Sequence, residues 1–95
     1  MVVEYTVVQS TEGLTTTELD VYGALDLDLL AVIEEDVGYR YIFYDSGSTV
    51  NYQSVYSAEG LSETELQDDY GDNDWQLITT LQPGVGIYYI FKDVS

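Results

Sequence analysis

Hydrophobic and polar residues alternate along several short segments of this chain, which is the pattern of strands that are buried on one face. Valine, isoleucine and tyrosine are common in these segments, and polar or glycine-containing turns separate them. The pattern predicts strands at 2–10, 27–34, 39–44, 50–57, 75–82 and 87–92. Because a tight turn joins the second strand to the third, and the fifth to the sixth, each half of the chain predicts one single strand and one hairpin.

A helix start lies between the single strand and the hairpin in each half. Both starts fit a capping box, in which a hydroxyl and a glutamate each accept a hydrogen bond from an otherwise unpaired amide. The capping pairs are Thr15 with Glu18 and Ser62 with Glu65. We expect the helices to end near Gly23 and Gly71, because glycine permits the left-handed conformation that closes many helices.

The two halves of the chain also resemble each other in sequence. Aligning 3–45 with 50–93, with one extra residue in the second half, brings many identical residues together. They include Val3/Val50, Tyr5/Tyr52, Gly23/Gly71, Leu29/Leu77 and Ile42/Ile90. Such self-similarity indicates an internal duplication, with a first β-α-β-β repeat at 1–46 and a second at 47–95. A unit of about 45 residues is close to the lower limit for independent folding, so we expect the repeats to pack as one compact domain.

This order of elements predicts an α+β fold. A strand, a crossover helix and a hairpin place the last strand of each repeat between the other two, with the outer two parallel to each other. Two such units could form one continuous six-stranded sheet or two packed three-stranded sheets. We expect two tandem β-α-β-β repeats that form a pseudo-twofold sheet structure, with two short helices shielding one side.

The second repeat carries a recognisable set of motifs. Gly71 is followed by Trp-Gln-Leu-Ile at 75–78 and, after a turn, by Tyr-Tyr-Ile-Phe-Lys at 88–92. This arrangement resembles a family of short bacterial and phage domains of unknown function, which have a β-α-β-β order and a closing strand rich in Tyr and Phe. The first repeat matches more loosely, because Leu27 stands in the tryptophan position. The resemblance implies the fold and carries no catalytic residue over.

Acidic residues greatly outnumber basic ones. The chain has 18 Asp and Glu against 2 Lys and Arg, which gives a formal net charge of −16. Self-repulsion should destabilise the fold in dilute buffer, and about 1 M salt should remove most of it because the Debye length falls to about 3 Å. The composition looks like that of proteins from extreme halophiles. We therefore expect a protein of a halophile's cytoplasm, without a signal peptide, or of the virion of a halophile's virus.

Several classes of chemistry lack their residues in this sequence. Cysteine and histidine are absent, so there is no thiolate nucleophile, no zinc thiolate site and no histidine base. No nucleophile elbow, phosphate-binding glycine loop or dinucleotide fingerprint occurs. We expect no enzyme activity, no cofactor and no small-molecule substrate. No basic patch favours nucleic acid as a direct partner, and no apolar run is long enough to cross a membrane.

The densest acidic run is a candidate cation site. Asp68, Asp69, Asp72 and Asp74 could offer the oxygen ligands that calcium or magnesium prefers. The spacing differs from that of an EF-hand loop. We interpret the run mainly as a solvated acidic surface at the end of a helix, and a cation-binding module is a third functional hypothesis.

Tyrosines are the main candidates for an interface. The chain has 10 of them, and alternation makes both faces of the third strand of each repeat partly apolar. We expect most of the rings to fill the core and Tyr44, Tyr56 and Tyr88 to lie at an external interface, where tyrosine is enriched. The predicted function is a non-enzymatic structural or protein-interaction module that binds a protein partner or itself, such as a virion head or tail component. The alternative is an acidic DNA mimic that inhibits a nucleic-acid-binding enzyme.

Overall fold

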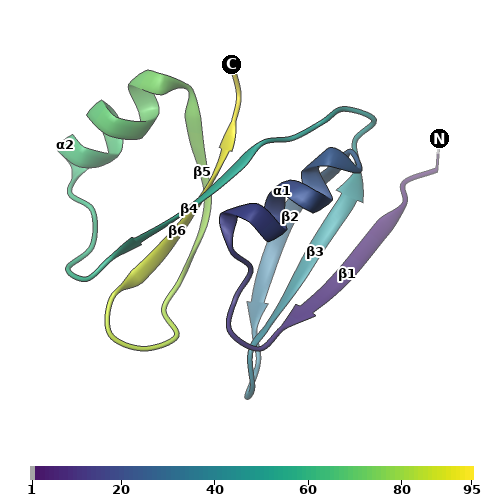
Figure 1. Cartoon of the computed structure of the whole chain (residues 1–95), viewed down its shortest axis with the longest axis horizontal. Helices are drawn as coiled ribbons and strands as arrows, with labels where there is room; N and C mark the ends of the chain where they lie inside the picture. The colour runs from purple at the N-terminus through teal and green to yellow at the C-terminus, as the bar shows by residue number, and fades with distance from the viewer. Residues whose placement is uncertain (1) are drawn as a thin grey trace.

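The computed structural model describes residues 2–95 and has an α+β fold (Figure 1). Each half of the chain contributes three strands and one helical segment. The elements of the first half are β1 (Tyr5–Ser10), α1 (Thr16–Ala24), β2 (Leu27–Glu34) and β3 (Tyr39–Asp45). Those of the second half are β4 (Tyr52–Ser57), α2 (Glu63–Glu65), η1 (Leu66–Tyr70), η2 (Gly71–Asn73), β5 (Trp75–Leu81) and β6 (Ile87–Asp93).

The strands form two separate three-stranded sheets, in the orders β1-β3-β2 and β4-β6-β5. All neighbouring strands are antiparallel, so the outer strands of each sheet run parallel to each other, as predicted. The hairpin partners carry the same irregularity, a bulge between Leu29 and Ala31 in β2 and between Leu77 and Thr79 in β5. The prediction of six strands is therefore confirmed, and the sheets are two rather than one continuous six-stranded sheet.

Capping boxes start both helical segments, as predicted. The Glu18 amide donates to the Thr15 hydroxyl at 3.2 Å, and the Thr15 amide donates to the Glu18 carboxylate at 3.1 Å. Ser62 and Glu65 make the same two bonds at 3.1 Å each. These reciprocal bonds satisfy amides that have no partner within the helix.

The helical segments end close to the predicted glycines, at Ala24 and Asn73, but the left-handed residue at each exit differs from the prediction. The left-handed residues are Asp26 and Asp74, with φ of 65° and 64°, and neither Gly23 nor Gly71 has a positive φ. Aspartate tolerates this conformation better than most residues do, so it can replace glycine at a helix exit. The prediction that Gly23 and Gly71 supply the left-handed residues is therefore wrong, and Gly23 has a packing role instead.

The second helical segment absorbs the extra residue of the second repeat. Leu66–Tyr70 forms a π-helical turn, which accommodates one additional residue within a helix. As a result, Tyr70 still faces the sheet and stacks on Phe91 with ring centroids 4.3 Å apart. In the first half, Tyr22 packs on Phe43 with centroids 5.2 Å apart.

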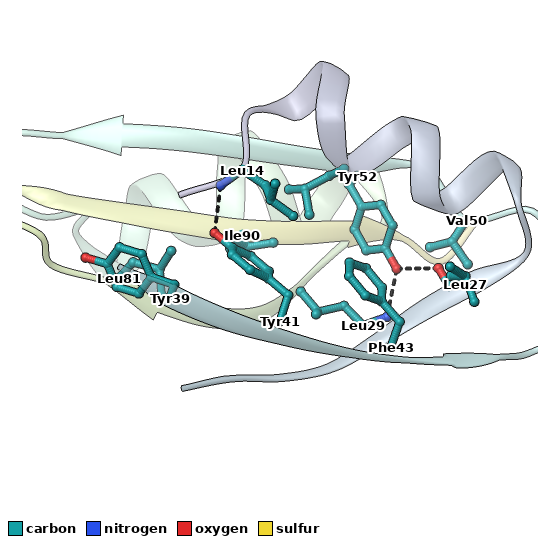
Figure 2. Packing of buried hydrophobic residues seen from close by; sticks show 11 residues of the cluster. Leu14, Leu27, Leu29, Tyr39, Tyr41, Phe43, Val50, Tyr52, Leu81 and Ile90 are labelled. Atoms are coloured by element: carbon teal, nitrogen blue, oxygen red, sulfur yellow. Dashed lines mark hydrogen bonds between the residues drawn. The ribbon is translucent and has the colours of Figure 1, made fainter. Parts of the chain in front are cut away.

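The hydrophobic core lies between α1, one face of the first sheet and one face of the second sheet (Figure 2). Both halves contribute to it. The first half supplies Leu14, Leu19, Leu27, Leu29, Tyr39, Tyr41 and Phe43, and the second supplies Val50, Tyr52, Leu81 and Ile90. Apolar side chains from both halves are thus removed from water together, which is the main favourable contribution to folding.

The contacts between the halves are not reciprocal. α1 lies against both β2 and β4, whereas within residues 2–95 the second helical segment makes no comparable contact with β1. It covers instead the face of the second sheet that points away from the first sheet (Figure 1). The helices therefore do not shield one common side, and the pseudo-twofold arrangement is not confirmed. Across the same residues, no helix has the length and apolar character needed to cross a bilayer.

Candidate functional site

One face of the first sheet carries a group of apolar side chains, several of them exposed. Cross-strand pairs place Tyr5 beside Tyr44, Val7 beside Ile42, and Ile42 beside Ala31. We define the outer face as Tyr5, Val7, Ala31, Ile33, Ile42 and Tyr44. Tyr5 is 63% exposed, and Val7 and Ile33 are also exposed. Side chains alternate across a strand, so α1 can cover only the opposite face, where Tyr39, Tyr41 and Phe43 are buried.

Charged groups flank this apolar surface at two ends. At one end, Arg40 pairs with Glu35 at 3.1 Å. At the other end, Lys92 of the second sheet pairs with Asp28 at 3.3 Å, and the Tyr44 hydroxyl donates to Asp28 at 3.4 Å. Apolar patches rimmed by polar groups are typical of interaction sites.

Part of the corresponding face of the second sheet is buried inside the molecule, whereas Tyr56 and Tyr88 at one end of that face are exposed. The buried part carries Tyr52, Leu81 and Ile90, which all belong to the shared core. We call the contact of this face with α1 and β2 the internal contact. Tyr52 is only 2% exposed, although the identical residue Tyr5 is largely exposed on the first sheet. The same residue type therefore meets two different environments in the two halves.

Tyr52 is the best-connected side chain of the internal contact (Figure 2). Its hydroxyl accepts a hydrogen bond from the Leu29 amide at 2.7 Å and donates one to the Leu27 carbonyl at 2.8 Å. These backbone groups lie on the free edge of β2, where no strand can pair with them. Burial raises the pKa of the Tyr52 phenol well above its usual value, which the hydrogen bond from Leu29 partly opposes.

Backbone groups of the second half also bind α1. The Tyr52 amide donates to the Asp20 carboxylate at 2.8 Å, and the Ser54 amide donates to the Thr16 hydroxyl at 2.9 Å. The Val50 amide donates to the Gly23 carbonyl at 3.1 Å. A methyl group on Gly23 would overlap the Val50 carbonyl oxygen, so the close approach requires glycine.

The three candidate interface tyrosines lie in two places. Tyr44 belongs to the outer face and is half-buried. Tyr56 and Tyr88 pack on each other across β4 and β6, with centroids 5.0 Å apart, and the Tyr56 hydroxyl donates to the Val85 carbonyl at 2.9 Å. Tyr5, Val7 and Ile33 were not among the predicted interface residues. The alternation of β1 was the available signal for them, because it predicts one apolar face that α1 cannot cover.

A cleft of about 480 Å³ separates the start of α1 from the second sheet. Its walls include Leu14, Thr15, Ser54, Leu81 and Tyr88. Glu12 is the one carboxylate in the lining, so the cleft does not bring together the pair of carboxyl groups that acid–base catalysis would use. The Thr15 hydroxyl already accepts a hydrogen bond from the Glu18 amide, so one of its lone pairs is not available to a ligand.

The four aspartates of the acidic run are spread over the exposed end of the second helical segment. Across residues 2–95, no three acidic side chains come close enough together to hold a metal ion. Asp68 and Asp69 are neighbours on the π-helical turn and therefore point in different directions. Asp72 accepts a hydrogen bond from the Gln67 amide group at 2.6 Å, and all four aspartates are exposed. The candidate cation site at Asp68, Asp69, Asp72 and Asp74 is therefore not assembled by this fold.

No protein-family model, curated protein sequence or solved structure matches this chain. The resemblance to short bacterial and phage domains consequently stays a prediction. A functional proposal has to rest on the exposed and buried surfaces of the molecule itself.

Proposed function

We propose that this protein is a non-enzymatic structural or protein-interaction module and that the outer face is its binding surface. One observation carries the proposal: Tyr5 is exposed on the first sheet, whereas its counterpart Tyr52 on the second sheet is buried against α1 and β2. Sheet faces of this apolar character are normally covered, because their exposure forgoes about 25 cal/mol for each Å² left in water. A protein partner would cover it.

The fold is proposed to derive from duplication of one β-α-β-β unit, residues 1–46 and 47–95. Three shared features support this origin: the same strand order, a bulge at the same place in β2 and β5, and a capping box at each helix start. A pseudo-twofold relation between the units would require contacts that the second helical segment does not make with β1. The observed contacts support a head-to-tail relation instead, in which the second sheet packs onto the first helix.

The proposal includes adaptation to high salt. Every charged side chain is at least partly exposed, since the buried set contains no polar or charged residue. The net charge of −16 is thus carried at the surface, where salt screens repulsion most effectively. A halophilic microbe or its virus is the setting in which such a surface is soluble and stable, and a virion head or tail component is the assembly role we favour.

A charge-matched pair of variants tests the binding surface. Val7→Asp with Ile33→Asp adds two charges to the outer face, and Val37→Asp with Val85→Asp adds two charges to exposed turn residues elsewhere. We expect the first variant to lose self-association, or binding of a protein from a halophile lysate, above about 1 M potassium chloride. The turn variant should keep it. Identical behaviour of the two variants and the wild type would contradict the proposal.

The alternative function, an acidic DNA mimic, predicts a different result. A mimic needs carboxylates along one track, whereas Glu35 is paired with Arg40 at one hairpin and the run at 68–74 lies on the far side of the second sheet. Competition between this protein and duplex DNA for a nuclease would support the alternative. We expect no competition above the effect of an equally charged polyanion.

A further inference from the structure

We propose that the occupant of the outer face is a second copy of this chain, bound head-to-tail in the same way as the second sheet binds α1 and β2 inside each molecule. This inference rests on the proposed function, because it names the partner of that surface. The second copy would use the side of its second unit that is formed by the second helical segment and the free edge of β5. We call this surface the receiving side, and its main residues are Leu61, Leu66, Gly71, Trp75 and Leu77.

The internal contact supplies the template for the docking face, by which we mean the outer face together with Val3, which precedes β1. Val50, Tyr52, Leu81 and Ile90 are buried there by α1 and β2. The equivalent positions in the first half are Val3, Tyr5, Ile33 and Ile42, of which Val3, Tyr5 and Ile42 are identical to their counterparts. Three of these residues are exposed and Ile42 is half-buried. Within residues 2–95, the first sheet and the residue before it therefore present side chains like those of the internal contact, and three of these four side chains are left exposed.

Residues of the receiving side are also more exposed than their equivalents in the internal contact. In the first half, Leu29 is 3% exposed, and Tyr52 packs at the β2 edge and accepts a hydrogen bond from the Leu29 amide. The identical Leu77 on β5 is 40% exposed. Leu66 is partly exposed although its counterpart Leu19 is fully buried. Within residues 2–95, no tyrosine hydroxyl binds the edge of β5 as Tyr52 binds that of β2.

Gly71 has no side chain that would block a backbone contact like the one between Gly23 and the Val50 carbonyl. In the internal contact, Gly23 is buried because the Val50 carbonyl lies against it. Gly71 is exposed, and a methyl group there would meet only the flexible end of Gln67. In a head-to-tail contact, the Val3 backbone of the incoming copy would lie against Gly71.

The ion pair of the internal contact, Lys92 with Asp28, has uncharged residues at both equivalent positions. Lys92 binds Asp28 across the internal contact at 3.3 Å. Their counterparts are Tyr44 on the docking face and Gln76 on the receiving side. Because the Tyr44 hydroxyl donates to Asp28 in its own molecule, it would accept a hydrogen bond from the side-chain amide of Gln76. No unpaired charge would therefore be buried at this position, which is the main electrostatic obstacle to burial.

A head-to-tail contact uses two different surfaces, so each added copy leaves one docking face and one receiving side free. Such heterologous contacts generate open chains, or rings where the rotation happens to close. Association should therefore continue beyond the dimer as protein concentration rises. It should also require salt, because every copy carries a net charge of −16 and unscreened repulsion opposes contact.

Two variants, one on each surface, test the arrangement with the full chain. Tyr5→Ser removes the central ring of the docking face, and Gly71→Ala places a methyl group in the receiving side. Both positions are exposed in the single molecule, so each variant should remain folded, which circular dichroism would verify. Gly84→Ala is the matched control, because a methyl group at Gly84 meets nothing within 4 Å. The mass would be measured by light scattering above about 1 M potassium chloride, over a hundredfold range of concentration.

We expect the wild type and Gly84→Ala to grow beyond the dimer, and Tyr5→Ser and Gly71→Ala to remain monomeric when measured alone. Mixing these two variants should give a particle of two chains and no larger, since one intact docking face then meets one intact receiving side. If Tyr5→Ser is monomeric but Gly71→Ala associates like the wild type, the outer face is still a binding surface and the head-to-tail arrangement is overturned. A wild type that stays monomeric at every concentration also overturns it, and the lysate experiment then judges the proposed function separately.

Discussion

Replacing Tyr52 by phenylalanine tests the internal contact at its most connected atom. The substitution keeps the ring in the core and removes only the hydroxyl, which binds the Leu29 amide at 2.7 Å and the Leu27 carbonyl at 2.8 Å. Each buried backbone group that loses its partner costs about 1–3 kcal/mol. We therefore expect Tyr52→Phe to lower the free energy of unfolding by about 2–6 kcal/mol, a large part of the 5–15 kcal/mol typical of a small domain.

The chain contains its own control for this substitution. Tyr5 is identical to Tyr52 in the sequence alignment but is 63% exposed, so Tyr5→Phe should change the free energy of unfolding by less than about 0.5 kcal/mol. Both variants would be unfolded in urea at one fixed high salt concentration and at a dilution where the protein is monomeric. Fluorescence of Trp75, the only tryptophan, would follow the transition. If Tyr52→Phe is as stable as Tyr5→Phe, the hydroxyl does not hold the two halves together and the reasoning fails.

Three further predictions concern packing, pH and salt. Gly23→Ala should lower the free energy of unfolding by about 1–3 kcal/mol, because the added methyl group overlaps the Val50 carbonyl. Gly71→Ala should be neutral or stabilise by up to about 1 kcal/mol. Equal effects of the two variants in urea unfolding would contradict the packing assigned to Gly23. Burial raises the pKa of Tyr41 and Tyr52, so their contribution to stability is complete at neutral pH and is lost as the pH rises above about 10, where the unfolded chain ionises first. Urea midpoints measured against pH, with tyrosinate absorbance as the titration signal, should show this decline, and the decline should be smaller in Tyr52→Phe. Raising potassium chloride from about 0.1 M to about 1 M should increase the urea midpoint, because the Debye length falls from about 10 Å to about 3 Å; an unchanged or lower midpoint would refute the role given to charge repulsion.

Local signals in the sequence were sufficient for the elements and their order. Alternation identified the strands, and the Thr15–Glu18 and Ser62–Glu65 pairs identified the helix starts, because these features depend on neighbouring residues only. The helix exits at Asp26 and Asp74 were missed, since glycine is the more common left-handed residue. The one-residue insertion in the second repeat corresponds to the π-helical turn, which was not predicted.

Packing between the halves could not be predicted from the same signals. Tyr5 and Tyr52 occupy equivalent positions in similar sequences, yet one is exposed and the other is buried. The difference arises because only the second sheet has a neighbouring unit, α1 with β2, on that face. Position in the assembled chain, rather than local sequence, decides which copy of an apolar face is covered. The cation-site hypothesis for the four aspartates at 68–74 depended on sequence proximity alone. Across residues 2–95, the structure brings no three acidic side chains together.

Amide hydrogen exchange at Tyr5 and Val7 tests the central claim, that the outer face and its edge strand are a binding surface, most directly. The pairing of the Asp45 amide with the Glu4 carbonyl sets the alternation of β1, so the Tyr5 and Val7 amides point away from β3 to the free edge. The equivalent amides of Tyr52 and Ser54 donate to α1 and should be protected at every protein concentration. Above about 1 M salt, we predict that Tyr5 and Val7 exchange rapidly in dilute protein and become protected as its concentration rises. Equally rapid exchange at all concentrations, with Tyr52 and Ser54 protected throughout, would contradict association through this face.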